Sequence, residues 1–171
     1  GHVLCVLDEA YAEYASGDDE PEGPQLIREG AENLLVLRTF SKIYGLAGLR
    51  IGYGLGSPAV SSAIDRIRAM FNVNAMAQRA ALASLDSQAE VWRRVDHVKS
   101  ARTQLLKYIS LAGHRPLASR TNFVFAEAAG GSGADVERRL LRLGVAVREL
   151  SGFGAPGAFR VTCGTDEENA F

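Results

Sequence analysis

The sequence has little cysteine, no excess of charge of either sign and no long apolar run. Its 171 residues carry 19 Lys and Arg against 20 Asp and Glu, a formal net charge of −1 at pH 7. A protein that binds nucleic acid through bulk charge needs a basic excess to neutralise phosphates, so this balance excludes that class. No apolar run approaches the roughly 20 residues of a membrane-spanning helix. We therefore expect no nucleic-acid partner and no membrane partner.

Cysteine and histidine are too sparse and too scattered to build a metal centre or a disulfide framework. Cys5 and Cys163 each lie in an apolar, strand-like run. We expect both to be reduced thiols in the core of a cytoplasmic protein, because disulfides are rare in the cytosol. The three histidines lack the spacing of metal ligands, and no Cys-x-x-Cys pair occurs. His97 lies in a long helical segment, where we expect a structural role.

Hydrophobic residues make up 47% of the chain, which excludes a disordered protein and is enough for a full core. Strand-like runs alternate with helical stretches, which predicts an α/β fold. The expected strands are 3–7, 34–38, a short segment within 45–54, 123–127, 145–148 and 159–163. The expected helices are 57–70, 75–112 with a break near 85–87, and 133–143. The first strand is continuously apolar, which predicts burial on both of its faces.

The two ends of the sequence differ from ordinary termini. The chain has no initiator Met and enters a strand almost at once. Thr165 and Glu168 have the spacing of a capping box that opens a helix, but only about a turn follows. We therefore expect a piece of a longer protein, with domains at 1–85 and 86–171. The acidic, Pro- and Gly-rich stretch 15–25 predicts an exposed loop.

Residues capable of chemistry follow the first two predicted strands. Asp8 and Tyr11 come after the first strand, and Ser41 and Lys42 come after the second. Arg50 stands eight residues beyond the lysine, among glycines. Each residue has an ordinary structural explanation when taken alone. Because ligands bind at the carboxyl ends of parallel strands in open α/β sheets, their order favours a shared site. An acid, a phenol, an amine and a guanidinium would suit a small heteroaromatic phosphate.

The segments 8–11 (Asp-Glu-Ala-Tyr) and 39–53 (Thr-Phe-Ser-Lys-Ile-Tyr-Gly-Leu-Ala-Gly-Leu-Arg-Ile-Gly-Tyr) resemble the pyridoxal-phosphate (PLP) segment of fold-type I aminotransferases. Within these, the sequence is most similar to the histidinol-phosphate aminotransferases, and the resemblance extends from Leu7 to Thr165. It implies the aspartate aminotransferase-like fold of PLP-dependent transferases. The chain would supply the rear of the large, mostly parallel-sheet domain, a bridging helix and most of a small α/β C-terminal domain.

The resemblance also implies roles for the residues that match its motifs. Lys42 would form the Schiff base with the cofactor and then act as the base that moves the substrate proton. Asp8 would keep the pyridine nitrogen protonated, and Tyr11 would hydrogen-bond the ring hydroxyl. Arg50 and the Ser41 hydroxyl would bind the cofactor phosphate.

Two further arginines, Arg148 and Arg160, flank a loop rich in Gly and Pro. Strand alternation places them side by side if their strands are antiparallel neighbours. Adjacent guanidinium groups repel unless an anion lies between them, so an anion site is one interpretation and a pair of surface salt bridges is the other. In the family that the sequence resembles, the matching arginines bind the substrate phosphate and the carboxylate of the amino donor.

The implied activity is PLP-dependent transamination between L-histidinol phosphate and 2-oxoglutarate in histidine biosynthesis, by a cytoplasmic homodimer. Other parts of the cofactor site would lie upstream, so we expect the isolated fragment to bind PLP weakly and to turn over little. A related aromatic amino acid aminotransferase and an amino-phosphate decarboxylase are alternatives, because the sequence encodes little of substrate choice. A PLP-binding sensor domain of a transcription regulator is a more distant one.

Overall fold

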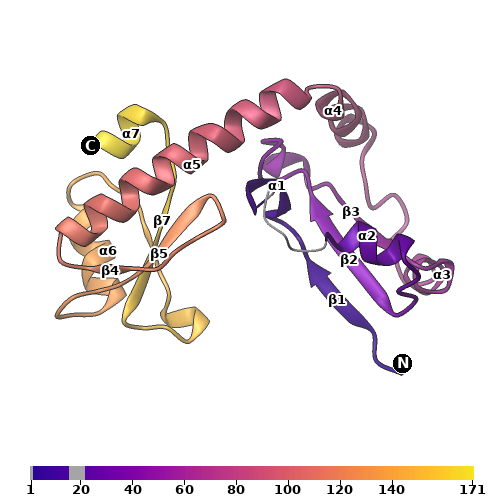
Figure 1. The fold of residues 1–171 in the computed structure, drawn as a ribbon, viewed down its shortest axis with the longest axis horizontal. Helices are drawn as coiled ribbons and strands as arrows, with labels where there is room; N and C mark the ends of the chain where they lie inside the picture. The colour runs from indigo at the N-terminus through magenta and orange to yellow at the C-terminus, as the bar shows by residue number, and fades with distance from the viewer. Residues whose placement is uncertain (1, 16–21) are drawn as a thin grey trace. The chain divides into compact units, whose positions relative to one another are not determined.

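The computed structural model describes residues 2–15 and 22–171 of the chain (Figure 1). Their contacts divide the chain into an N-terminal unit, Gly1–Arg93, and a C-terminal unit, Arg94–Phe171. Both units contain strands and helices, as expected for an α/β protein. Among the described residues, no helix combines the length and the apolar character that a membrane crossing requires.

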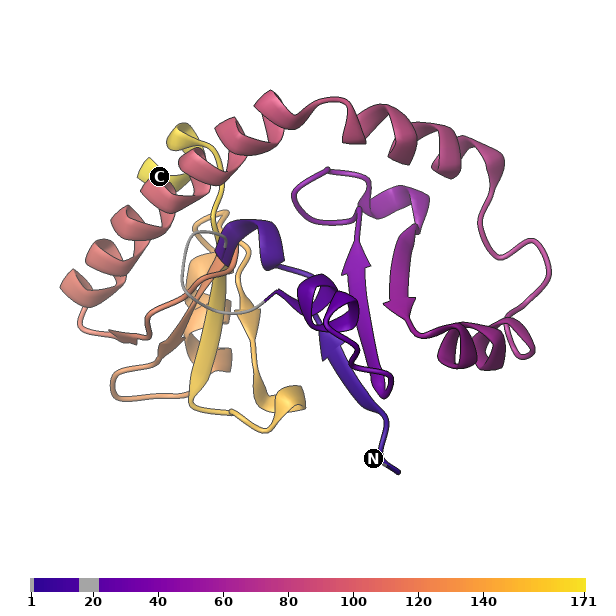
Figure 2. The same cartoon turned by 45° about the vertical axis from the view of Figure 1, so that its right-hand side comes forward.

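The N-terminal unit is built on a three-stranded sheet in the order β1-β2-β3 (Figures 1 and 2). Its strands are β1 (Cys5–Asp8), β2 (Leu34–Thr39) and β3 (Gly52–Gly56). β1 and β2 run parallel, whereas β2 and β3 run antiparallel, so the described part of this sheet is mixed. Its helices are α1 (Ala12–Ala15), α2 (Gly23–Arg28), α3 (Pro58–Asp65) and α4 (Ala75–Leu85).

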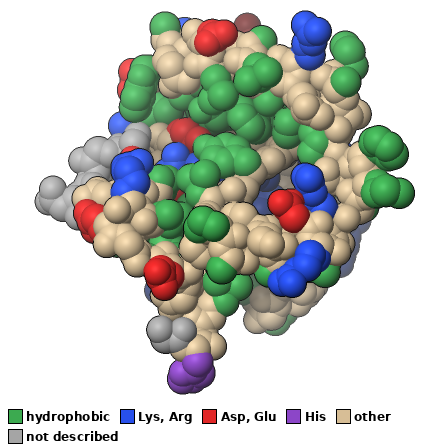
Figure 3. Space-filling view, turned by 90° about the vertical axis from the view of Figure 1, so that its right-hand side faces the viewer, with side chains coloured by type: hydrophobic (Ala, Val, Ile, Leu, Met, Phe, Trp, Pro, Cys, Tyr) green, Lys and Arg blue, Asp and Glu red, His purple; other side chains and the backbone are tan. Residues whose placement is uncertain are grey.

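The prediction that the first strand is buried on both faces is wrong. All four residues of β1 are exposed, including Cys5, which is therefore not a core thiol. A continuously apolar strand needs a layer on each face, and the described residues do not provide these layers for β1. Figure 3 shows one side of the molecule, on which hydrophobic side chains are spread among charged ones.

The predicted loop at 15–25 is also wrong at its two ends. Ala15 closes α1, and α2 begins at Gly23, which is buried. A side chain at Gly23 would place its Cβ 2.5 Å from Cγ2 of Val36, so only glycine lets α2 start this close to the sheet. Residues 16–21 lie outside the described part of the chain.

The helix starts in the N-terminal unit follow local capping signals. The Ser57 hydroxyl accepts the Val60 amide at the start of α3, and the Asn74 side chain accepts the Ala77 amide at the start of α4. Both are N-caps, which stabilise the first turn by satisfying a free amide. α3 ends at Asp65, earlier than the predicted 70. The predicted break near 85–87 is confirmed, because α4 ends before α5 (Gln88–Leu111) begins.

The C-terminal unit contains a four-stranded antiparallel sheet in the order β4-β5-β7-β6. Its elements are β4 (Arg115–Pro116), β5 (Phe123–Glu127), α6 (Gly133–Leu141), β6 (Arg148–Glu149), β7 (Ala158–Thr162) and α7 (Asp166–Ala170). The core joins α5 and α6 to the two central strands through Leu105, Ile109, Val124, Ala126, Val136 and Phe159. Cys163 packs against this core half-buried, and burial raises the pKa of its thiol.

The predicted strand at 145–148 is shorter and lies later in the chain, as β6. Gly144 adopts a left-handed conformation with φ 88°, and the Val145 amide donates to the Leu140 carbonyl. These two features close the C-terminal end of α6 in the manner of a helix C-cap. Val145, which was predicted to start the strand, therefore belongs to the C-terminal cap of α6, and β6 begins only at Arg148.

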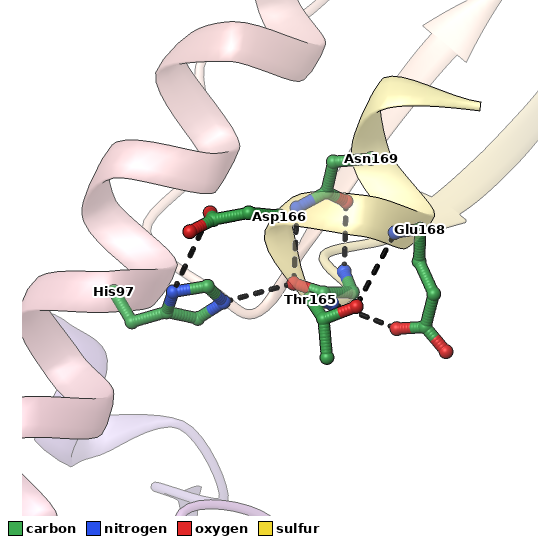
Figure 4. A network of polar contacts seen from close by, with 6 residues as sticks. His97, Thr165, Asp166, Glu168 and Asn169 are labelled. Atoms are coloured by element: carbon green, nitrogen blue, oxygen red, sulfur yellow. Dashed lines mark hydrogen bonds and ion pairs between the residues drawn. The ribbon is translucent and has the colours of Figure 1, made fainter.

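The capping box predicted at Thr165 is confirmed, and it opens α7. Figure 4 shows how α5 meets this helix start through His97. Its Nε2 lies 2.9 Å from the Gly164 carbonyl oxygen, and its Nδ1 lies 3.9 Å from Oδ1 of Asp166. His97 thus has the structural role expected of it, which is to join α5 to the start of α7.

Candidate active site

The ends of three strands meet at one edge of the N-terminal sheet. Asp8, the last residue of β1, is in register with Leu37 near the end of β2. Thr39 at the end of β2 pairs with Gly52 at the start of β3, and the Phe40 amide donates to the Ile51 carbonyl at 3.2 Å. This edge therefore brings together the predicted site residues of the N-terminal unit: Asp8, Tyr11, Ser41, Lys42 and Arg50.

Lys42 and Tyr11 contact each other at this edge. The Lys42 Nζ lies 5.3 Å from the centroid of the Tyr11 ring, within the range of a cation–π interaction. The lysine is exposed, whereas the tyrosine is half-buried. An amine and a phenol from two different strand ends thus share one small region of the surface.

The turns that carry Asp8 and Ser41 are fixed by local hydrogen bonds. Asp8 Oδ1 accepts the Ala10 amide at 3.0 Å, which makes an Asx turn directly after β1. The Ser41 amide donates to Oγ1 of Thr39 at 3.0 Å. The Gly45 amide donates to the Lys42 carbonyl. Both turns are therefore ordered by their own side chains and backbone.

Arg50 occupies a left-handed backbone conformation with φ 53°, which is uncommon for a residue other than glycine. Its Nη1 donates to the Ala47 carbonyl at 2.7 Å, across the 3-10 turn Ala47–Leu49. A Cβ at Gly52 would lie 2.7 Å from the Arg38 carbonyl oxygen. The glycine-rich loop thus brings β3 close to β2 while it holds the exposed Arg50 guanidinium at the same edge.

Sequence reasoning missed an ion pair that lies behind this edge, between Glu9 and Arg38. The Arg38 Nη2 lies 2.8 Å from Oε2 of Glu9, and both side chains are largely buried. Burial opposes the charge of Arg38, but the hydrogen bond and the negative charge of Glu9 outweigh it and raise the pKa of the guanidinium. The sequence did contain a signal for this pair, namely an arginine at the end of the apolar run of β2. A buried charge needs a partner of opposite charge.

Glu13 lies on α1 in the same group of charged side chains. Burial, its largest influence, raises the pKa of its carboxyl group, and the charge of Arg38 partly offsets that rise. The region behind the edge therefore contains one arginine shared among several glutamates. The pKa values of its side chains therefore depend on burial as well as on the neighbouring charges.

In the C-terminal unit, Arg148 and Arg160 face each other as register partners of the antiparallel strands β6 and β7. The expectation that they lie side by side is confirmed. The Arg160 guanidinium carbon lies 4.7 Å from the centroid of the Phe123 ring. Its Nε is buried and has no hydrogen-bond partner among the described residues. A buried donor without an acceptor is costly, so this arginine is suited to an anion.

Two cavities lie apart from the N-terminal sheet edge and from the arginine pair of the C-terminal unit. A cavity of about 650 Å³ in the N-terminal unit is lined by Ile51, Gly52 and the segment 68–73, among others. A cavity of about 300 Å³ in the C-terminal unit is lined by His114, the 129–132 loop and arginines of α6. None of the predicted site residues lines either cavity. Among the described residues, no group of three His, Cys, Asp or Glu side chains is arranged to hold a metal ion.

The donor set at the sheet edge fits the small heteroaromatic phosphate that the sequence predicts. A carboxylate at Asp8 can pair with a protonated ring nitrogen, and the Tyr11 phenol can donate to a ring oxygen. The Arg50 guanidinium and the Ser41 hydroxyl are suitable phosphate donors. The Lys42 amine is available on the surface of the same edge.

Comparisons with known proteins place this chain in a family. The family model for aminotransferase class I and II matches residues 1–170. The chain is 45% identical to a histidinol-phosphate aminotransferase of Anaeromyxobacter sp., over 98% of this chain and 46% of that protein. It is 41% identical to the enzyme of the same name from Geobacillus sp., again over 98% of this chain and 46% of that protein.

Solved structures of this class have the same fold. The histidinol-phosphate aminotransferase of Sinorhizobium meliloti, solved with pyridoxal-5'-phosphate, is 33% identical with a TM-score of 0.86, over 98% of this chain and 46% of that one. The aspartate aminotransferase of Thermotoga maritima is 23% identical with a TM-score of 0.84, over 99% and 45%, and shows the fold alone. The chain spans about half the length of the curated relatives it matches. With a family model that covers nearly every residue, the chain belongs to the aminotransferase class I and II family.

Proposed function

We propose that this chain is the C-terminal part of a PLP-dependent aminotransferase that moves an amino group between L-histidinol phosphate and 2-oxoglutarate in histidine biosynthesis. The observation that carries the proposal is the meeting of Asp8, Tyr11, Lys42 and Arg50 at one sheet edge. The partial length rests on the share of the relatives that the chain covers. The substrate class rests on relatives named for histidinol phosphate at 40–45% identity.

Each residue at the sheet edge has a role that its chemistry supports. When bound, PLP supplies an electron-withdrawing ring that accepts the electron pair released at the substrate α-carbon. The Lys42 Nζ would hold the cofactor and would act as the base that moves the proton at the substrate α-carbon. Asp8 keeps the ring nitrogen protonated, while Tyr11 donates a hydrogen bond to the ring oxygen. Arg50 and Ser41 bind the phosphate.

Substrate anions are assigned to the arginine pair of the C-terminal unit. Arg160 presents a buried Nε that has no hydrogen-bond partner within the described part of the chain, and Arg148 lies next to it in register. Two neighbouring guanidinium groups favour a ligand with negative charge, and the proposed substrates carry phosphate or carboxylate groups. The Phe123 ring beside Arg160 supports the guanidinium from one side.

We also propose that the full-length enzyme works in the cytoplasm as a homodimer. Large apolar side chains of the N-terminal unit are exposed, with Phe71 at 96%, Met70 at 86% and Ile67 at 84% of their accessible surface. Clustered apolar surface of this kind marks an interaction site in a folded protein. Sedimentation of the full-length enzyme tests the homodimer, and a monomer at micromolar concentration would contradict it.

An amino-donor screen tests the reaction. The full-length protein is supplied with 2-oxoglutarate and with L-histidinol phosphate, L-phenylalanine or L-aspartate, and the glutamate formed is measured. We expect the highest kcat/KM with histidinol phosphate. Turnover of phenylalanine alone would replace the proposal with an aromatic amino acid aminotransferase. Release of carbon dioxide from an amino-acid phosphate such as O-phospho-L-threonine, in a reaction without 2-oxoglutarate, would replace it with an amino-phosphate decarboxylase.

The assignment of Arg160 is tested in the same assay with a matched control. Arg160→Met removes the proposed anion contact, whereas Arg139→Met removes an exposed arginine of α6. We expect the first variant to lower kcat/KM by about 100-fold, since hydrogen bonds to charged groups contribute roughly 1.5–3 kcal/mol. The control is expected to stay within about twofold. Equal effects of the two variants would contradict the assignment.

A further inference from the structure

The Glu9 carboxylate connects three segments of the N-terminal unit. Its Oε1 accepts the Gly23 amide at 2.7 Å, at the start of α2. Its Oε2 accepts Nε and Nη2 of Arg38 on β2, each at 2.8 Å. The exposed fractions of the two side chains are 13% for Glu9 and 17% for Arg38. One nearly buried carboxylate therefore ties the end of β1 to both a neighbouring strand and a helix.

The backbone of Glu9 is bound as firmly as its side chain. Its amide donates to the Leu37 carbonyl at 2.9 Å, and its carbonyl accepts the Ala12 amide at 3.1 Å. Glu9 directly follows Asp8, and the turn that it opens carries Tyr11 into α1. Movement of Glu9 would therefore displace both residues that are assigned to the cofactor ring.

The start of α2 approaches the Glu9 carboxylate so closely that position 23 has no room for a side chain. A Cβ at Gly23 would lie 2.6 Å from Oε1 of Glu9 and 3.0 Å from Cδ2 of Leu7. Glu22, the other acidic partner of Arg38, is 3.5 Å away and mostly exposed. Glu9 is thus the short, buried partner of the arginine, and Glu22 contributes at the surface.

A buried ion pair of this kind contributes little net stability, because the cost of desolvating two charges offsets most of their attraction. Catalytic constellations, in contrast, depend on being held within about 0.5 Å of their working geometry. We propose that Glu9, clamped by Arg38 and the Gly23 amide, is a positioning residue that holds Asp8 and Tyr11 in place for the cofactor ring. This proposal rests on the proposed function of the sheet edge.

Three variants of the full-length protein separate positioning from stability. Glu9→Gln leaves an acceptor for Gly23 but turns an NH2 donor toward Arg38. The double variant Glu9→Gln and Arg38→Met removes the unpaired charge and also the side-chain contact between position 9 and Arg38, so that position 9 is tied to β2 only by its backbone hydrogen bond to Leu37. Glu127→Gln is the control, because it removes an exposed ion pair with Arg115 in the C-terminal unit.

Three quantities are measured for each variant: the Kd of PLP by titration of the apoprotein, the exchange rates of the Ala10 and Ala12 amides in the apoprotein, and Tm. Glu9→Gln is expected to raise the Kd about 10- to 100-fold and to speed the exchange of both amides about tenfold, as expected for loss of a hydrogen bond to a charged group. The double variant is expected to recover the wild-type Tm but not the Kd or the exchange rates. The Glu127→Gln control is expected to leave the Kd unchanged.

A double variant that recovers Kd and exchange together with Tm would overturn the proposal, because the pair would then act through stability alone. Unchanged Kd and exchange in Glu9→Gln would overturn it as well. If the wild-type protein binds no PLP, the proposed function fails instead. The clamp is then judged by the amide exchange rates, which need no cofactor, and unchanged rates would overturn it.

Discussion

The two units of this chain achieve order in different ways. In the C-terminal unit, the central strands present fully buried side chains such as Val124 and Phe159, which pack against α5 and α6. In the N-terminal unit, β1 is exposed along its length, and the residues assigned to chemistry are held by hydrogen bonds and an ion pair. Both units bury apolar side chains, including Val36 and Ile43 in the N-terminal unit. The difference lies at the sheet edge with the proposed cofactor site, which is held by polar contacts, whereas the centre of the C-terminal sheet is held by burial.

The largest expected difference between the units concerns core truncation. In the 171-residue chain, Phe159→Ala is expected to destabilise the C-terminal unit by about 3–5 kcal/mol, because it empties a packed site. Val6→Ala on β1 is expected to cost less than about 0.5 kcal/mol, because that side chain is 56% exposed. Amide exchange resolved by residue measures each unit separately. Similar losses for the two variants would break the comparison.

A smaller effect is expected where a helix start meets the sheet. Gly23→Ala forces a Cβ against Val36 and Glu9, and overpacking of this kind costs about 1–3 kcal/mol. Gly152→Ala is the matched control in the C-terminal unit, since nothing lies within 4 Å of its added Cβ. Denaturant titration of both variants checks the difference. A neutral Gly23→Ala would show that α2 is not held against the sheet.

The smallest effect concerns α7, a part of the C-terminal unit that is held by polar contacts. The backbone hydrogen bond from Thr165 lowers the pKa of the Glu168 carboxyl below its ordinary value of 4.5. The capping box is therefore fully formed above that ordinary value and weakens as the pH falls through the lowered one. Exchange of the Glu168 and Asn169 amides should speed up as the pH falls through that range, beyond the intrinsic pH dependence of exchange. Glu168→Gln keeps a capping side chain without the titration, and an unchanged pH response in that variant would refute the explanation.

Features set by neighbouring residues were predictable from the sequence. Ser57 and Thr165 cap helices through amides three residues away. Strand alternation made the pairing of Arg148 with Arg160 an expectation only on the condition that their strands are antiparallel neighbours, which β6 and β7 are. Features that depend on distant segments were not. The exposure of β1 depends on which layers cover it, and the Glu9–Arg38 pair joins residues from two strands. The apolar run around Arg38 indicates that this arginine needs a partner, but it does not identify Glu9, and no local pattern shows which layers cover β1.

The most direct test of the central claim is covalent trapping of PLP. The full-length protein is incubated with PLP and reduced with borohydride, and its peptides are mapped by mass spectrometry. The account predicts stoichiometric modification of Lys42, none at the exposed Lys99 and Lys107, and weak modification of the 171-residue chain alone. No modification at Lys42, or modification spread evenly over the three lysines, would contradict it.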